Sequence, residues 1–263
     1  MIRPRPPLPA WLRPGITAAV LAWLAYAALT MAIQISAGVP YAEWFTRADH
    51  AWRVGVLSLA AGSLALAGFV ALTRWNHLWR DPRPLGSSRA MRIAMALWGL
   101  AIALRLAGVD WPHVRWPLLL AVLAAGVLVG FAEETLFRGL LLRGLRQGGR
   151  AEAPAALWTA AGFGLFHLPN VFMGTGMIGL VQVVLAGMSG LVLYAFRRHF
   201  GRLWPAMLAH GSWDVSAFLA SGPSAPWVPW ASLAMQGLLL VAAGFIVADL
   251  LRHDRHSPAL PPG

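Results

Sequence analysis

Glu133, Glu134 and Arg138 stand together in an otherwise apolar stretch, LAAGVLVGFAEETLFRGLLLRGLR. On an α-helix, adjacent residues point about 100° apart, so the two carboxyl groups face different surroundings. Residues four apart lie on the same face, and this spacing predicts an ion pair between Glu134 and Arg138. Glu133 is then free of that pair, and its carboxyl group is the candidate general base of a site.

Two other stretches repeat the four-residue spacing with a histidine. Phe163 precedes His167 in FGLFH, and His210 precedes Asp214 in HGSWD. On a helix, the members of each pair share one face. A carboxyl group and two imidazoles that converge in a poorly solvated cavity can activate a water molecule. We therefore expect the side chains of Glu133, His167 and His210 to meet.

Long apolar runs must position these residues. The chain has 263 residues, of which 58% are hydrophobic and 12% charged, whereas soluble domains average about 25% charged residues. A run of about 20 apolar residues crosses a bilayer as a helix. We predict an all-α polytopic membrane protein and no barrel, since regular alternating segments are absent. The eight predicted spans are 15–37, 54–75, 90–109, 117–142, 154–168, 176–197, 203–221 and 228–250.

Ionisable side chains inside such spans indicate function. An acid or base at the centre of a membrane helix costs ~2.5 to 3.5 kcal/mol on insertion scales, so these residues usually face a cavity or one another. Their clustering on three predicted helices favours a single polar site. For His167 to reach Glu133, the span at 154–168 must tilt strongly or begin in the cytoplasm.

The basic residues, all arginine, alternate between rich and poor loops. The net charge is +11, but the arginines are dispersed and no nucleic-acid-binding module is present, so we predict no nucleic-acid partner. An excess of arginine marks cytoplasmic loops, which places both termini in the cytoplasm. The opposite loops carry Arg47, Arg53 and Arg115. The arginines of the rich side are Arg3, Arg5, Arg13, Arg74, Arg80, Arg83, Arg89, Arg92, Arg143, Arg146, Arg150, Arg197, Arg198, Arg202, Arg252 and Arg255.

The chain is expected to form one domain. Residues 15–250 make up the transmembrane domain, with the motifs in 117–215. Residues 1–14 and 251–263 are rich in proline and basic residues and are predicted to be cytoplasmic tails. The sequence has no cysteine, which excludes disulfides, iron–sulfur clusters and thiolate metal sites.

The three motifs together resemble those of the CPBP intramembrane proteases. EETLFRG matches the EExxxR motif, FGLFH matches FxxxH, and HGSWD matches HxxxN or HxxxD. That family includes the type II CAAX prenyl endopeptidases and bacterial homologues named for abortive infection or bacteriocin self-immunity. The resemblance covers about residues 117–215, with the motifs in the family's order on separate spans. It implies an intramembrane endopeptidase.

The resemblance also implies roles for individual residues. Glu133 and His167 would hold and activate the attacking water, while His210 and Asp214 would stabilise the oxyanion of the tetrahedral intermediate. Many family members have asparagine in the place of Asp214. An ionised carboxylate would repel an oxyanion, so Asp214 must be protonated, orient His210 or serve another purpose. The remaining motif residues would support the site; they are Glu134, Arg138 and Phe163.

Metal is the main chemical alternative. Two histidines and two carboxylates are a possible zinc set, and in this chain Glu133, His167 and His210 would be the ligands. However, the HExxH pattern is absent, and neither histidine is spaced to pair with another on one helix. We therefore favour a metal-free mechanism with no cofactor.

Other functions and the substrate stay open at the sequence level. A proton-coupled transporter could use intramembrane Glu and His as a relay, although the sequence shows no inverted repeat. A non-catalytic membrane scaffold could keep the same fold. For a protease, the expected substrate is a peptide or lipidated protein in the bilayer, and the resemblance suggests a bacterial inner membrane. Whether the substrate is prenylated, and the oligomeric state, cannot be read from the sequence.

Overall fold

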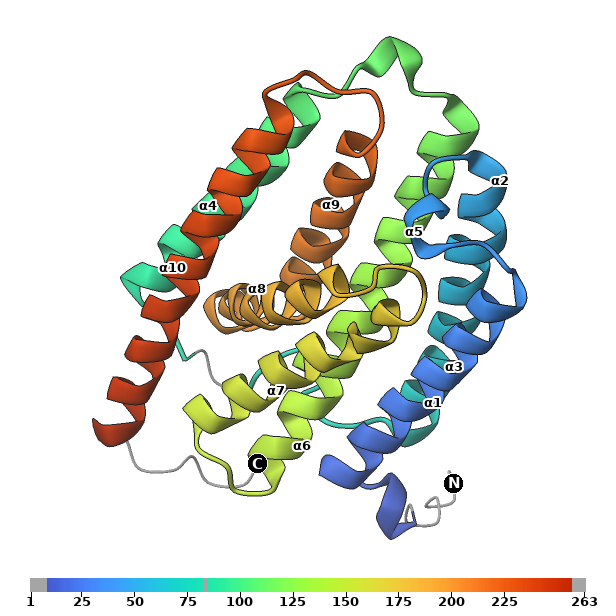
Figure 1. Cartoon of the computed structure of the whole chain (residues 1–263). Helices are drawn as coiled ribbons and strands as arrows, with labels where there is room; N and C mark the ends of the chain where they lie inside the picture. Colours follow the sequence, from blue (N-terminus) through green and yellow to red (C-terminus); the bar gives the residue numbers. More distant parts are fainter. Residues whose placement is uncertain (1–8, 83–84, 257–263) are drawn as a thin grey trace, which may run out of the picture.

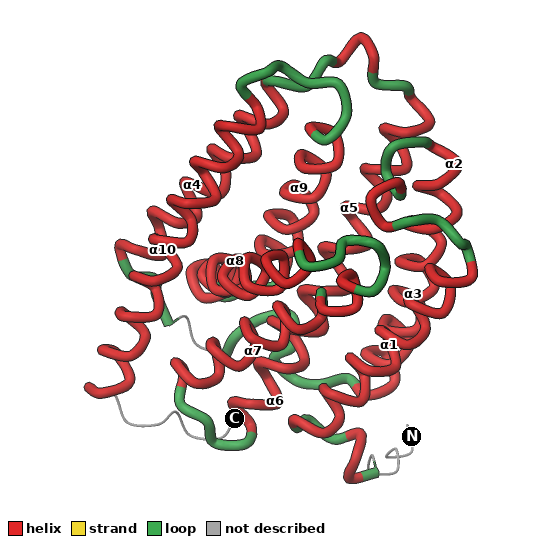
Figure 2. The backbone as a smooth tube through the Cα atoms, in the orientation of Figure 1, coloured by secondary structure: helices red, strands yellow, loops and turns green. Residues whose placement is uncertain are grey.

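The computed structural model describes residues 9–82 and 85–256, which fold into helices joined by loops (Figures 1 and 2). No strand occurs in this part of the chain, so the all-α prediction is confirmed. The longer helices are α1 (Ile16–Ser36), α3 (Leu57–Thr73), α4 (Arg89–Ala107), α5 (Trp116–Glu134), α7 (Glu152–Phe166), α8 (Ile178–Phe200), α9 (Trp204–Ala220) and α10 (Val228–His256). The shorter segments are η1 (Ala10–Leu12), η2 (Tyr41–Glu43), α2 (Ala48–His50), η3 (Ala51–Val56), η4 (Trp111–His113), η5 (Thr135–Leu141), α6 (Leu142–Gln147) and η6 (Leu168–Val171).

Each predicted span overlaps one of the longer helices. Six helices are long and apolar enough to cross a membrane, which confirms a polytopic membrane protein. They are α1, the continuous helix Ala48–Thr73, α4, the continuous helix Trp116–Gln147, α8 and α10. The other two, α7 with 15 residues and α9 with 17, are shorter. Helix α10 continues past residue 250 into the predicted tail, and the tail residues 1–8 and 257–263 lie outside the described part.

Local sequence explains several helix ends that matter for the site. Helix α7 ends at Phe166 ahead of Pro169, which has no N–H to donate to a preceding carbonyl and so cannot continue the α-helix. Helix α8 ends at Phe200, and the next residue, Gly201, adopts a φ of 61° that suits glycine. Helix α4 begins where the Ser88 hydroxyl accepts a hydrogen bond from the Met91 N–H at 3.2 Å.

The helices pack in pairs around the centre of the bundle. Helix α5 lies against α9, α7 against α8, α4 against α10, and α1 against α3. Figure 1 shows α8 almost end-on, whereas α4, α9 and α10 run along the plane of the view, so α8 crosses the other helices. The central core includes Leu136, Phe137 and Leu140 of η5, each 1% exposed or less. Segment η5 therefore occupies the middle of the packing.

A buried ionic network closes the arginine-rich end. Asp81, in the connection between α3 and α4, accepts hydrogen bonds from Arg146 at 3.1 Å and from Arg197 at 2.7 Å. Arg146 also donates to Glu152 at 3.0 and 2.6 Å, and the Tyr194 hydroxyl donates to the same carboxylate. The network joins the α3–α4 connection to α6, α7 and α8.

Candidate active site

The paired acids lie where the helix changes its winding. Glu133 and Glu134 are the last two residues of α5, and the π-helical segment η5 follows directly. Both side chains are buried. The wider π turns are rare inside α-helices, and those that do occur are often at functional sites. The apolar residues of η5 gave no sign of this change in the sequence.

The predicted ion pair is confirmed. The Arg138 Nη1 atom donates to Glu134 Oε1 at 2.9 Å, and both side chains are fully buried. A second nitrogen of the guanidinium, Nη2, donates to the Gly190 carbonyl of α8 at 3.0 Å. The guanidinium carbon also lies 4.3 Å from the centre of the Phe163 ring. Arg138 therefore connects η5 to α7 and α8.

His210 lies between the two acids. Its Nδ1 atom is 2.9 Å from Glu134 Oε1, and because the paired carboxylate only accepts, Nδ1 must donate. The other ring nitrogen, Nε2, is 3.9 Å from Glu133 Oε2 and 3.8 Å from Asp214 Oδ2. Both distances are longer than that of a direct hydrogen bond. One imidazole thus faces both neighbouring glutamates, which helical spacing alone did not predict.

His167 is held at the end of α7. Its Nδ1 atom lies 2.9 Å from the Phe163 carbonyl oxygen, and since a carbonyl only accepts, Nδ1 carries the proton. Nε2 of the neutral ring is then an acceptor. The helix reaches this position because it begins at Glu152, inside the network at the arginine-rich end. This start lies two residues before the predicted span 154–168, and a start in the cytoplasm or a strong tilt of this helix stays a prediction.

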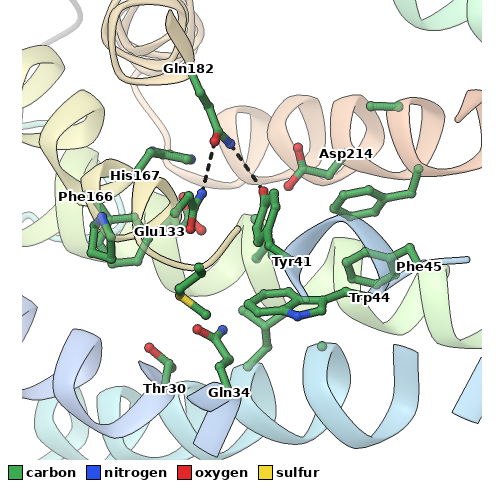
Figure 3. Close-up of a pocket in the computed structure, with 18 of the residues that line it drawn as sticks. Thr30, Gln34, Tyr41, Trp44, Phe45, Glu133, Phe166, His167, Gln182 and Asp214 are labelled. Atoms are coloured by element: carbon green, nitrogen blue, oxygen red, sulfur yellow. Dashed lines mark hydrogen bonds between the residues drawn. The ribbon is translucent and has the colours of Figure 1, made fainter. Parts of the chain in front are cut away.

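A cavity brings three of the four predicted catalytic residues together. It has a volume of about 390 Å³, and Glu133, His167 and Asp214 line it (Figure 3). His210 is 5% exposed and packs behind the lining, with its ring centre 5.3 Å from that of Phe163. The supporting residue Phe163 likewise lies behind the lining.

Polar residues that the sequence analysis missed face the same cavity. The Asn170 amide donates to Gln182 Oε1 at 3.1 Å, and the Gln182 amide donates to the Tyr41 hydroxyl at 3.2 Å. This chain joins η6, α8 and η2 across the cavity (Figure 3). Gln182 could have been found from the sequence, because an uncharged amide inside a predicted apolar span also needs a hydrogen-bond partner. Tyr41 and Asn170 lie in loops and had none.

The proposed zinc ligands do not form a metal-binding group. Within residues 9–82 and 85–256, no three side chains of the His, Cys, Asp or Glu type are grouped so that they could hold a metal ion. The nitrogen and oxygen atoms of Glu133, His167 and His210 are suitable ligands by type, but the set is not assembled in this arrangement.

Comparison with known proteins gives one match. The model of the family described as "Type II CAAX prenyl endopeptidase Rce1-like" matches residues 115–216. This segment contains all three motifs and runs from the start of α5 to the second half of α9. Neither the search of curated proteins nor that of solved structures gives a match.

Proposed function

Because residues 115–216 belong to the family of Rce1-like type II CAAX prenyl endopeptidases, we propose that this protein is an intramembrane endopeptidase. It hydrolyses a peptide bond in a membrane-associated peptide or lipidated protein. The observation that carries the proposal is the cavity in which Glu133, His167 and Asp214 face one space, with His210 against its wall. By the same resemblance, the protein acts in a bacterial plasma membrane.

Glu133 and His167 activate the attacking water in this proposal. Glu133 removes one proton as the water oxygen attacks the carbonyl carbon, and the same proton then passes to the leaving amine as the C–N bond breaks. The Nε2 atom of His167 can accept a hydrogen bond from the water because its Nδ1 proton is held by the Phe163 carbonyl. Both side chains line the cavity.

His210 stabilises the oxyanion. Its Nδ1 proton is committed to Glu134, so Nε2 can donate a hydrogen bond only from a doubly protonated ring. The carboxylates of Glu133, 3.9 Å from Nε2, and Glu134, 2.9 Å from Nδ1, supply negative charge that stabilises such a ring. Glu134 and Arg138 position the imidazole and do not touch the substrate.

The proposed reaction needs no metal ion. It requires only a carboxylate base, an imidazole acceptor and a charged donor, and the described side chains supply all three. Total-metal analysis of the purified protein, together with cleavage assays after chelation, tests this point. Stoichiometric zinc, with activity lost to a chelator and restored by zinc, would overturn it.

Substitution of the base is the central test. Glu133→Gln keeps the size of the side chain but removes its basicity, and we expect kcat/KM for peptide cleavage to fall by about 10²–10⁴-fold. The matched control is Asp110→Asn, because Asp110 also contacts a histidine, His113, at 2.7 Å but lies outside the cavity. Its activity should equal that of the wild type. Wild-type cleavage by Glu133→Gln would contradict the proposal.

A further inference from the structure

The cavity occupies only one half of the bundle. Helices α1 and α9 both start near arginine-rich connections and run toward the opposite end. On α1 the lining residues are Tyr26, Thr30 and Gln34, all in the second half of the helix, and on α9 the lining begins at Trp213 and continues to Ser221 just past its end. From Glu133 outward, the space therefore extends away from the arginine-rich end.

Packed side chains close the cavity toward the arginine-rich end. Directly after the paired acids, Leu136, Phe137 and Leu140 are 1% exposed or less, and Arg138 is 1% exposed. The Arg138 guanidinium fills the space between η5 and α8 through its bond to the Gly190 carbonyl. Beyond them, the ionic network around Asp81 ties the same end together. Within the described part of the chain, these packed side chains close the direct route from that end to Glu133.

The mouth lies at the opposite end. Ala42, Thr46 and Ser221 line the cavity and are solvent-exposed. Thr46 belongs to the connection between α1 and α2, and Ser221 to the connection between α9 and α10. In Figure 1 the end of α9 and α2 lie in the upper half, whereas the start of α1 and the end of α10 lie in the lower half.

The distribution of arginines orients this mouth in a membrane. Eleven of the 21 arginines lie in or next to the connections that follow α3, α6 and α8, whereas four lie in or next to the connections on the mouth side, namely Arg47, Arg53, Arg105 and Arg115. Arginine-rich connections are retained in the cytoplasm. The mouth therefore faces the non-cytoplasmic side.

The lining restricts what can enter. Among the described residues that line the cavity there is no arginine, and the charged groups are the acids Glu133 and Asp214. A free carboxylate would meet these acids, and the imidazolium of His210 beside them is already paired with Glu134. The remaining lining consists of aromatic and aliphatic side chains with amide and hydroxyl groups, among them Gln34 and Asn170. Such a surface suits an extended peptide that is uncharged or cationic.

We propose that the substrate is an internal peptide segment presented from the non-cytoplasmic face of the membrane, in an exported or membrane-anchored protein. This inference rests on the proposed endopeptidase function and adds the side of access and the chemistry of the cleaved segment. A prenylated C-terminal peptide in the cytoplasm does not meet either condition.

The absence of cysteine from the chain makes the side of access directly measurable. Single variants Gln34→Cys and Ser221→Cys, inside the cavity and at its mouth, are treated with a membrane-impermeant thiol reagent in sealed right-side-out vesicles. Asn76→Cys, in the exposed connection after α3, is the matched control. We expect labelling of the first two in intact vesicles and of Asn76→Cys only after permeabilisation. The reverse pattern, or Gln34→Cys that reacts only after permeabilisation, overturns the inference.

A cleavage assay separates this inference from the proposed function. Each reporter protein carries an uncharged segment, drawn from a library, between a tag and a single-span membrane anchor. The segment lies on either the cytoplasmic or the non-cytoplasmic side of the membrane. Each reporter is expressed together with the wild type or with Glu133→Gln. Wild-type-dependent cleavage only on the non-cytoplasmic side supports the inference. Cleavage that depends on Glu133 but occurs only on the cytoplasmic side overturns the inference and leaves the protease function standing. If the reporters on both sides give the same products with the wild type and with Glu133→Gln, this result counts against the protease function itself.

Discussion

At the scale of single residues, Glu133 and Glu134 differ in their partners more than in their positions. Glu134 binds Arg138 and the Nδ1 side of His210, whereas Glu133 faces Nε2 of the same ring and the open cavity. Helical spacing was sufficient to predict the ion pair of Glu134 with Arg138 and to predict that Glu133 points away from this pair. It could not show that one imidazole touches both acids, because spacing gives the direction of a side chain on its own helix and not the neighbour on another.

Asp214 is the residue at which the charge of the site can be tested. Its carboxylate lies 3.8 Å from His210 Nε2 and lines the cavity. We expect Asp214→Asn to retain kcat/KM within about threefold, because an amide can donate a hydrogen bond to an oxyanion. Asp214→Leu, of similar size without hydrogen-bonding groups, should lose about 10²–10³-fold. Peptide-cleavage kinetics of the two purified variants provide the measurement.

The two variants at Asp214 have different consequences for the mechanism. An asparagine variant as inactive as the leucine variant would show that the negative charge, acting on His210, is what the site needs. Equal activity of both variants with the wild type would remove Asp214 from the oxyanion site altogether. Correct folding of each variant is checked by its thermal unfolding temperature.

At the scale of elements, glycines set the distance between α5 and α9. A Cβ atom on Gly130 would collide with the Met207 carbonyl oxygen, and one on Gly211 would collide with that of Gly126. Small residues let membrane helices approach closely. Since α5 carries Glu133 and α9 carries His210, this close crossing brings the two side chains to 3.9 Å.

We therefore expect Gly130→Ala to damage the site. Overpacking at this crossing should destabilise the protein by about 1–3 kcal/mol, and a displacement of about 1 Å between reacting groups can cost about 10²-fold in rate. Cleavage kinetics and thermal unfolding measure both effects. The control is Gly99→Ala on α4, where an added Cβ meets nothing within 4 Å. It should be neutral or slightly stabilising, and equal effects of the two substitutions would refute the role of the crossing.

The elements show where sequence reasoning succeeded and where it failed. Apolar length predicted every long helix, since burying backbone polar groups in lipid requires helices. The π-helical segment η5 and the crossing direction of α8 were not predictable, because they depend on packing between segments distant in the sequence. The cavity lining from η2 and η6 was missed for the same reason: short loops carry no periodic pattern.

At the scale of the whole molecule, the arginines have two functions that the sequence did not separate. As a group they predict orientation in the membrane. Individually, Arg146 and Arg197 are buried partners of Asp81, and Arg146 also binds Glu152. Nothing in the sequence indicates this network, because its members are far apart along the chain. It holds the closed end of the bundle, opposite the mouth of the cavity.

Acidification should weaken this closed end. Burial alone would raise the pKa of Asp81, but the guanidinium groups of Arg146 and Arg197 outweigh it and hold that pKa below its ordinary value. Burial of Glu152 is likewise outweighed by Arg146, so its pKa is also lowered. A carboxylate with a lowered pKa contributes stability above the ordinary value of about 4, and this contribution is lost as the pH falls through the lower folded value.

Asp81→Asn tests the network at neutral and acid pH. At neutral pH it removes the carboxylate partner of the buried Arg197, while Arg146 keeps Glu152, and we expect the free energy of unfolding to fall by about 3–5 kcal/mol. The matched control is Asp49→Asn, whose partner Arg47 is exposed, and it should unfold like the wild type. Thermal unfolding in detergent should show the gap between wild type and Asp81→Asn narrowing below pH about 4, because the wild-type carboxylate then takes up a proton. A gap that stays constant down to pH about 2 would show that the charge of Asp81 does not stabilise the fold.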